Sequence, residues 1–192
     1  MFELNKITRS NIERLKAYSS ARDEFTDAKG IFLDANENPY GTMNRYPDPY
    51  QKELKEEITK INGIGANNIF IGNGSDEVID LLFRVFCNPS IDKALTFAPT
   101  YGMYDVSAGI NDVELIKVPL NDTFDIDFES VQSYLADPKL KLILICAPNN
   151  PTGNCPSPET VVRIIENFKG IVLIDEAYIN FSAKQSFTNF IA

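Results

Sequence analysis

Short apolar runs alternate with segments of helical periodicity along most of the chain, and this alternation most constrains the possible fold. Five of the runs are predicted to be β-strands: residues 69–71, 93–97, 113–118, 140–147 and 171–174. Continuous apolar strands separated by amphipathic helices are typical of parallel sheets that are covered on both faces. The sequence therefore predicts an α/β fold, a three-layer α/β/α arrangement around a mainly parallel sheet.

The ends of the expected helices carry recognisable signals. Polar residues that can accept hydrogen bonds from backbone N–H groups precede most of them, and Gly63 and Gly170 follow two of them. The expected starts are Ser10 with Glu13 in a capping box, Asp48-Pro49, Ser75, Asp127 and Ser157-Pro158.

Composition narrows the classes of protein to consider. The 192 residues are 44% hydrophobic, enough for one globular domain with a core, and no apolar run is long enough to span a membrane. The N-terminus lacks the pattern of a signal peptide, and three cysteines without a CxxC pair are typical of a reducing compartment, so we expect a cytoplasmic protein. A net charge of −9 argues against nucleic acid as a partner.

The chain contains no histidine. This excludes Ser-His-Asp and Cys-His catalysis and histidine-based zinc sites from these residues, and no metal site is expected. Chemistry would depend on carboxylates, tyrosines, lysines or a bound cofactor. Residues 1–30 are more polar and irregular than the rest, so we expect an N-terminal arm there and a domain from residue 31 to residue 192.

In open parallel sheets, ligands bind beyond the carboxyl ends of the strands, and three segments are expected at such ends. The first is the turn Gly72-Asn73-Gly74-Ser75-Asp76 at a helix N-terminus, where N–H groups favour an anion such as phosphate. A tight turn without a ligand is the alternative interpretation. Glu77 stands where a dinucleotide-binding loop needs its third glycine, which disfavours a Rossmann-type site.

The other two segments carry aromatic, amide and acidic side chains. Tyr101 follows the strand that ends near Phe97, and it is either a core residue or a platform for a flat ligand. Asn150 lies in the turn after the expected strand 140–147. Asp175 and Tyr178 follow the apolar run 171–174. Asp175 is either a helix cap or salt-bridge partner, or an acid that pairs with a ligand.

Seven motifs, in order along nearly the whole chain, resemble the fold type I aminotransferases that use pyridoxal 5′-phosphate. The resemblance is closest to the histidinol-phosphate aminotransferases, because of the Asn-Glu-Asn-Pro and Arg-Tyr-Pro motifs. The matching segments are Tyr18-Ser19-Ser20-Ala21-Arg22, Leu33-Asp34-Ala35-Asn36-Glu37-Asn38-Pro39, Arg45-Tyr46-Pro47, Gly72-Asn73-Gly74-Ser75-Asp76-Glu77, Pro99-Thr100-Tyr101, Asn149-Asn150-Pro151-Thr152-Gly153 and Asp175-Glu176-Ala177-Tyr178.

The resemblance implies a role for each candidate residue. Asp175 would pair with the pyridine nitrogen of the cofactor, Asn150 and Tyr178 would hydrogen-bond its ring oxygen, and Tyr101 would stack on the ring. The remaining implied roles are phosphate binding by Gly74, Ser75 and Asp76, phosphate binding across a homodimer interface by Tyr46, and binding of a phosphorylated substrate by Tyr18 and Asn36. The implied reaction moves an amino group between glutamate and imidazole-acetol phosphate, giving histidinol phosphate in histidine biosynthesis.

One element of the family pattern is missing from these residues. The family's Schiff-base lysine lies a few tens of residues after the Asp-Glu-Ala-Tyr motif, in a Ser-Lys context. Here the lysine that follows Asp175 is Lys184, in Ser182-Ala183-Lys184-Gln185, and it is too close to Asp175. We therefore expect the N-terminal portion of such an enzyme, comprising part of its large domain, and no aminotransferase activity from these residues alone.

Other interpretations remain at this stage. Another fold type I aminotransferase or a phosphothreonine decarboxylase would share nearly every motif. A non-catalytic module that binds an anion or a protein partner would lack the lysine altogether.

Overall fold

A computed structural model of the chain describes residues 3–19, 31 and 33–190. The chain forms two compact units, one of Met1–Glu13 with Gly72–Ala192 and one of Arg14–Ile71, and each is described by itself. Residues 20–30 of the expected N-terminal arm, including Ser20, Ala21 and Arg22 of the first motif, lie outside the described residues. Within the described part of the chain, no helix is long and apolar enough to cross a membrane.

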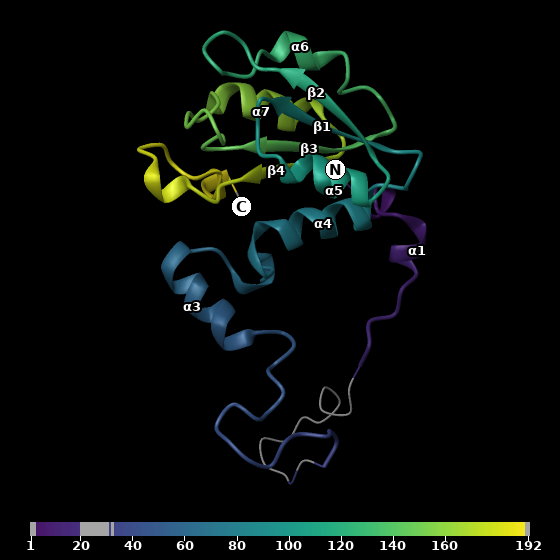
Figure 1. The fold of residues 1–192 in the computed structure, drawn as a ribbon, viewed down its shortest axis with the longest axis vertical. Helices are drawn as coiled ribbons and strands as arrows, with labels where there is room; N and C mark the ends of the chain where they lie inside the picture. Colours follow the sequence, from purple (N-terminus) through teal and green to yellow (C-terminus); the bar gives the residue numbers. More distant parts are fainter. Residues whose placement is uncertain (1–2, 20–30, 32, 191–192) are drawn as a thin grey trace. The chain divides into compact units, whose positions relative to one another are not determined.

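The first unit is built on a four-stranded parallel sheet in the order β2-β1-β3-β4 (Figure 1). The strands are β1 (Lys93–Ala98), β2 (Glu114–Pro119), β3 (Leu140–Cys146) and β4 (Ile171–Asp175). Four of the five predicted strands are thus confirmed to within about a residue at each end. The register places Cys146, the last residue of β3, opposite Asp175, the last residue of β4.

Helices cover both faces of this sheet, which confirms the three-layer prediction (Figure 1). Helices α4 (Gly74–Phe86) and α5 (Met103–Ile110) pack on one face, and α6 (Phe128–Gln132) and α7 (Pro158–Asn167) pack on the other. The alternation of side chains along β3 divides the core accordingly. Leu142 and Leu144 pack with Phe83 of α4, whereas Ile143 and Ile145 belong to the cluster on the opposite face.

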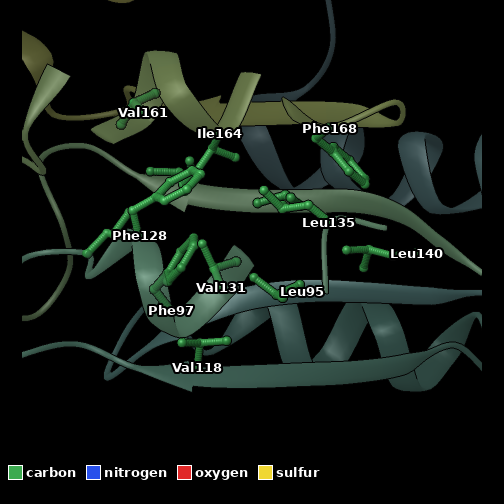
Figure 2. Close-up of a cluster of buried hydrophobic side chains, with 13 residues drawn as sticks. Leu95, Phe97, Val118, Phe128, Val131, Leu135, Leu140, Val161, Ile164 and Phe168 are labelled. Carbon is green, nitrogen blue, oxygen red and sulfur yellow. The ribbon is translucent and has the colours of Figure 1, made fainter. Parts of the chain in front are cut away.

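Figure 2 shows the core cluster on the face covered by α6 and α7. Side chains of β1 and β2 meet residues of α6 and α7 there, and Val131 and Ile164 are completely buried. The two helices start as predicted. The Asp127 carboxylate accepts a hydrogen bond from the N–H of Glu129, and the Ser157 hydroxyl accepts one from the N–H of Thr160.

Short helices flank the sheet at both ends of the first unit. η1 (Leu4–Lys6) and α1 (Ser10–Glu13) precede it, and the backbone N–H of Arg9 donates to the carbonyl of Val85 at 3.0 Å. η3 (Ile179–Phe181) and η4 (Phe187–Phe190) follow β4. Glu176 holds this last segment, since its carboxylate accepts hydrogen bonds from the Ser186 hydroxyl at 2.5 Å and the Phe187 N–H at 2.7 Å.

The second unit contains α3 (Lys52–Asn62) and η2 (Ala66–Asn68). Gly63 ends α3 as predicted, with a left-handed φ of 71° that suits glycine. The predicted start of the helix at Asp48-Pro49 is wrong. Gln51 occupies the N-cap, and the Asp48 carboxylate instead accepts hydrogen bonds from the N–H groups of Tyr50 and Lys52.

Two further predictions about local structure are wrong. Residues 69–71 do not form a strand: Ile69 has extended backbone angles, but the segment joins no sheet, and the side chain of Phe70 is 66% exposed. An extended backbone becomes a strand only when a neighbour satisfies its N–H and C=O groups. Ser75 does not cap α4, because the helix begins one residue before it with Asn73 at the N-cap.

Candidate ligand-binding site

A buried carboxylate stands at the carboxyl end of β4. Asp175 is 7% exposed; its Oδ2 accepts a hydrogen bond from the Tyr104 hydroxyl at 3.0 Å, and its Oδ1 accepts one from the N–H of Ala177 at 3.1 Å. No lysine or arginine among the described residues forms an ion pair with it. Burying an anion with neutral donors alone is costly, so Asp175 is suited to a ligand that brings a positive charge.

Tyr104 was not among the residues expected at the site. It lies in the first turn of α5, is fully buried, and its ring meets that of Tyr101 edge to face, with centroids 5.7 Å apart. Burial, with Cys146 and Asp175 nearby, raises the pKa of the Tyr104 hydroxyl far above its ordinary value, so the group stays protonated and donates. A buried tyrosine needs a hydrogen-bond partner, but the burial of Tyr104 is evident only from the structure.

Tyr101 and Asp76 join two elements at the same edge. The Tyr101 hydroxyl donates to Oδ1 of Asp76, in the first turn of α4, at 3.2 Å. Partial desolvation raises the pKa of Tyr101, and the charge of Asp76 adds to this, as do Asp175 and Tyr178. The structure therefore brings these four predicted site residues into one neighbourhood.

The turn before α4 leads into a helix N-terminus that has no capping side chain among the described residues. Gly74, the first residue of the helix, has a φ of +79°, which favours glycine. The N–H of Asn73 donates to the Glu77 carboxylate at 2.5 Å, and the N–H of Gly74 donates to the carbonyl of Gly72 at 3.1 Å. The N-cap residue, Asn73, makes no capping hydrogen bond with its side chain to the first turn of the helix. N–H groups in the first turn of a helix have no acceptor within the helix itself.

The two adjacent asparagines after β3 behave differently. Asn149 is buried; its amide oxygen accepts from the Thr100 hydroxyl at 2.7 Å, and its amide nitrogen donates to the carbonyl of Pro99 at 3.0 Å and to the hydroxyl of Thr152 at 2.7 Å. Asn150 forms no side-chain hydrogen bond with the described residues. It lines an open cleft of about 340 Å³ together with Tyr178 and others: Pro148, Asn149, Pro151, Gly153, Phe181 and Ser182.

The remaining predicted residues are elsewhere. Tyr18, Asn36 and Tyr46 belong to the unit Arg14–Ile71, and all three side chains are exposed. The backbone N–H of Tyr46 donates to the Glu37 carboxylate at 2.9 Å. Lys184 is exposed and lines a separate hollow of about 420 Å³ formed mainly by residues 155–158 and 184–190.

The fold and the residues at this edge of the sheet together define a class of protein. A parallel α/β unit that gathers a buried acid, an amide without a partner among the described residues, an aromatic ring and a helix N-terminus at the carboxyl ends of its strands has the features of a small-molecule site. The family model for aminotransferases of class I and II matches residues 17–192, and the chain belongs to this family.

Curated relatives agree with this assignment. The chain is 52% identical over 191 residues to the histidinol-phosphate aminotransferase of Cytophaga hutchinsonii, which covers 97% of this chain and 55% of that protein. It is 50% identical over 188 residues to the one from Parabacteroides distasonis, covering 97% of this chain and 54% of the relative. The chain thus spans about half the length of the curated relatives it matches.

Solved structures support the fold. The crystal structure of the histidinol-phosphate aminotransferase from Clostridium acetobutylicum matches with a TM-score of 0.66 and 27% identity, covering 77% of this chain and 43% of that one. The enzyme from Sinorhizobium meliloti, solved in complex with pyridoxal-5′-phosphate, matches with a TM-score of 0.64 and 24% identity over 72% of this chain and 38% of its own. The similarity to the Sinorhizobium meliloti structure concerns the fold alone.

Proposed function

We propose that the protein to which this chain belongs is a pyridoxal 5′-phosphate-dependent aminotransferase acting on histidinol phosphate. It would move an amino group between glutamate and imidazole-acetol phosphate, with histidinol phosphate as the phosphorylated amine. The relatives that share about half of their residues with this chain bear the name of that activity.

Asp175 is the observation that carries the proposal. Its carboxylate is buried, is held by two neutral donors and has no cationic partner among the described residues. A protonated pyridine nitrogen would supply the missing positive charge, and the carboxylate would keep that nitrogen protonated. The residues present therefore fit the ring of this cofactor.

Other residues at the edge would hold the rest of the molecule. Asn150 and Tyr178 line one cleft and would hydrogen-bond the ring oxygen, while Tyr101 would cover a face of the ring. The first turn of α4, at Gly74, Ser75 and Asp76, would bind the phosphate through backbone N–H groups and the helix dipole. Bound in this way, the cofactor supplies an electron sink for the carbon that loses its proton.

The chain's own residues would therefore act by binding and orientation. The proton-transferring lysine would come from outside these 192 residues, since Lys184 lines a different hollow from Asn150 and Tyr178. We further propose that Tyr46 binds the cofactor phosphate across the interface of a homodimer, and that Tyr18 and Asn36 contact the substrate. We also propose that the enzyme is cytoplasmic. Residues 1–30 would form an N-terminal arm, and the large domain would begin at residue 31.

The deciding experiment is a half-reaction with the complete gene product and bound cofactor. Mixing it with histidinol phosphate alone should convert the cofactor to its amine form and release imidazole-acetol phosphate, and glutamate should give the same conversion. Phosphothreonine is the discriminating control. Release of carbon dioxide from phosphothreonine without conversion by histidinol phosphate would reject the proposal in favour of a decarboxylase.

A further inference from the structure

The hydrogen bond between Tyr104 and Asp175 is a feature that the proposed roles do not use. The Tyr104 hydroxyl is 3.0 Å from Oδ2 of Asp175, both side chains are buried, and they come from residues 71 positions apart in the chain. Neither Tyr104 nor Asp175 lines the cleft that Asn150 and Tyr178 share. Because Tyr104 is fully buried and its hydroxyl donates to Asp175, it would affect a ligand through the carboxylate.

The surroundings of Tyr104 fix this hydrogen bond in one direction. Burial raises the pKa of the Tyr104 hydroxyl, so it is protonated at neutral pH, and a carboxylate can only accept. The ring is held edge-on against Tyr101 at 5.7 Å and packs in the core cluster with Ile79 and Phe83 of α4. The donor therefore has a fixed position.

The second donor to Asp175 is equally fixed. The N–H of Ala177 is a backbone group two residues on, 3.1 Å from Oδ1. Each carboxylate oxygen thus has one donor, and each retains further acceptor capacity for a ligand. With one donor per oxygen, the plane of the carboxylate cannot turn without breaking a hydrogen bond.

We infer that Tyr104 is a positioning residue: its hydroxyl orients the Asp175 carboxylate so that it selects a ligand with a protonated ring nitrogen. This rests on the proposed function, because it concerns the same ligand. Tyr104 touches neither substrate nor cofactor in this role. It acts on affinity for the ring nitrogen specifically, and not on affinity for the phosphate or the ring face.

The test compares two ligands that differ at one atom. Pyridoxine 5′-phosphate carries the ring nitrogen but no aldehyde, so its binding needs no lysine; its benzene analogue has carbon in place of that nitrogen. Dissociation constants for both are measured by equilibrium dialysis on the complete gene product freed of cofactor. Tyr104→Phe removes the hydroxyl and keeps the buried ring, and Tyr134→Phe, at a partly exposed tyrosine away from Asp175, is the matched control.

The unsubstituted protein and Tyr134→Phe should prefer the pyridine ligand, and Asp175→Asn should abolish that preference. Tyr104→Phe should reduce the preference on the order of tenfold, the effect of one hydrogen bond to a charged group, while affinity for the benzene analogue stays the same. A general structural defect would weaken both ligands together, and melting temperatures of each variant check this separately.

The outcomes separate the two proposals. If the unsubstituted protein has no preference for the ring nitrogen, the proposed function fails. If the preference exists, is lost in Asp175→Asn and persists undiminished in Tyr104→Phe, the function stands and the positioning role is rejected. An equal loss of affinity for both ligands in Tyr104→Phe also rejects it.

Discussion

At the scale of single residues, neighbours in the sequence have separate tasks. Asn149 and Asn150 are chemically identical, yet the amide of Asn149 has three partners, whereas that of Asn150 has none among the described residues and lines the cleft. Asn149 links the segment after β1 to the turn after β3. The sequence motif contains both residues, but only the structure separates the one that builds the turn from the one available to a ligand.

This division predicts that substitutions at the two positions lower stability by different amounts. Asn149→Ala leaves buried partners unsatisfied and should lower the free energy of unfolding by about 2 to 3 kcal/mol. Asn150→Ala should lower it by less than about 0.5 kcal/mol, because no hydrogen bond is lost. Urea denaturation followed by circular dichroism measures both, and equal losses in the two variants would contradict the assignment.

The three cysteines should differ in reactivity in the folded protein. Burial raises the pKa of Cys87 to about 12, and it also raises the pKa of Cys146, so both remain protonated thiols at neutral pH. Cys155 is partly exposed, with its Sγ 3.4 Å from the Ser182 hydroxyl. Because the thiolate is the nucleophile, a maleimide should label Cys155 first and the other two only after unfolding.

Mass spectrometry after brief labelling measures this order. Cys155→Ser should remove the fast phase and leave the slow labelling of the other thiols unchanged. A fast phase that survives this substitution would show that one of the buried cysteines is accessible.

At the scale of elements, α7 shows how the sequence pattern divides into a buried and an exposed face. Ile164 is completely buried in the cluster of Figure 2, whereas the adjacent Ile165 is 43% exposed. Ile164→Ala should therefore cost about 3 kcal/mol of unfolding free energy, from lost burial and the cavity it leaves. Ile165→Ala should cost less than about 1 kcal/mol. Chemical denaturation of both variants checks the pair, and similar losses would mean that α7 packs in a different rotation.

The elements that could be predicted are those whose signals are local. A continuous apolar run such as 140–147 needs no knowledge of its neighbours, and Asp127 and Ser157 cap the turns that directly follow them. Residues 69–71 have the same apolar character, but their assignment as a strand depended on a pairing partner that sequence does not reveal. For the same reason, Asp175 could be named as a candidate site residue from the sequence. Its hydrogen-bond partner Tyr104 lies 71 residues earlier and could be identified only from the fold.

At the scale of the whole molecule, a net charge of −9 makes paired carboxylates important for stability in acid. Asp137 accepts a hydrogen bond from the N–H of Lys139 and lies 3.4 Å from Nζ of Lys93; the backbone hydrogen bond is the main cause that lowers its pKa below 3.8, with Lys93 adding to it. A pKa that is lower in the folded state gives stability that is present above the unfolded value of 3.8 and is lost as the pH falls through the folded value.

Asp137→Asn should therefore lower the melting temperature at neutral pH and make its decline in acid shallower. Thermal unfolding from about pH 6 down to about pH 2 follows the loss, which begins near the unfolded value of 3.8 and continues as the pH falls through the lower folded value. Asp122→Asn is the matched control, since Asp122 is exposed and forms no hydrogen bond or ion pair with the described residues. If the two variants show the same acid profile, the Asp137 contacts do not stabilise the fold.

The distribution of functional groups over the whole chain predicts how it responds to the cofactor. Asp175, Asn150, Tyr101 and the turn at Gly74 lie at one edge, but Lys184 lines a separate hollow. The hydrogen bond from Ser157 lowers the pKa of Glu159, and the charge of Lys184 adds to this. An exposed lysine reacts with an aldehyde weakly and reversibly. We therefore predict that these 192 residues, mixed with pyridoxal phosphate, show no visible absorption band that survives dialysis and depends on Lys184.

Spectra of the unsubstituted chain, Lys184→Ala and Lys169→Ala after dialysis make the comparison, with Lys169 as an exposed lysine on a different loop. The three spectra should coincide, because neither lysine lines the cleft of Asn150 and Tyr178. A stable band that disappears only in Lys184→Ala would place this lysine beside the ring after all. It would mean that the segment after β4 refolds around the ligand, and that the site is complete without the part of the family pattern that follows.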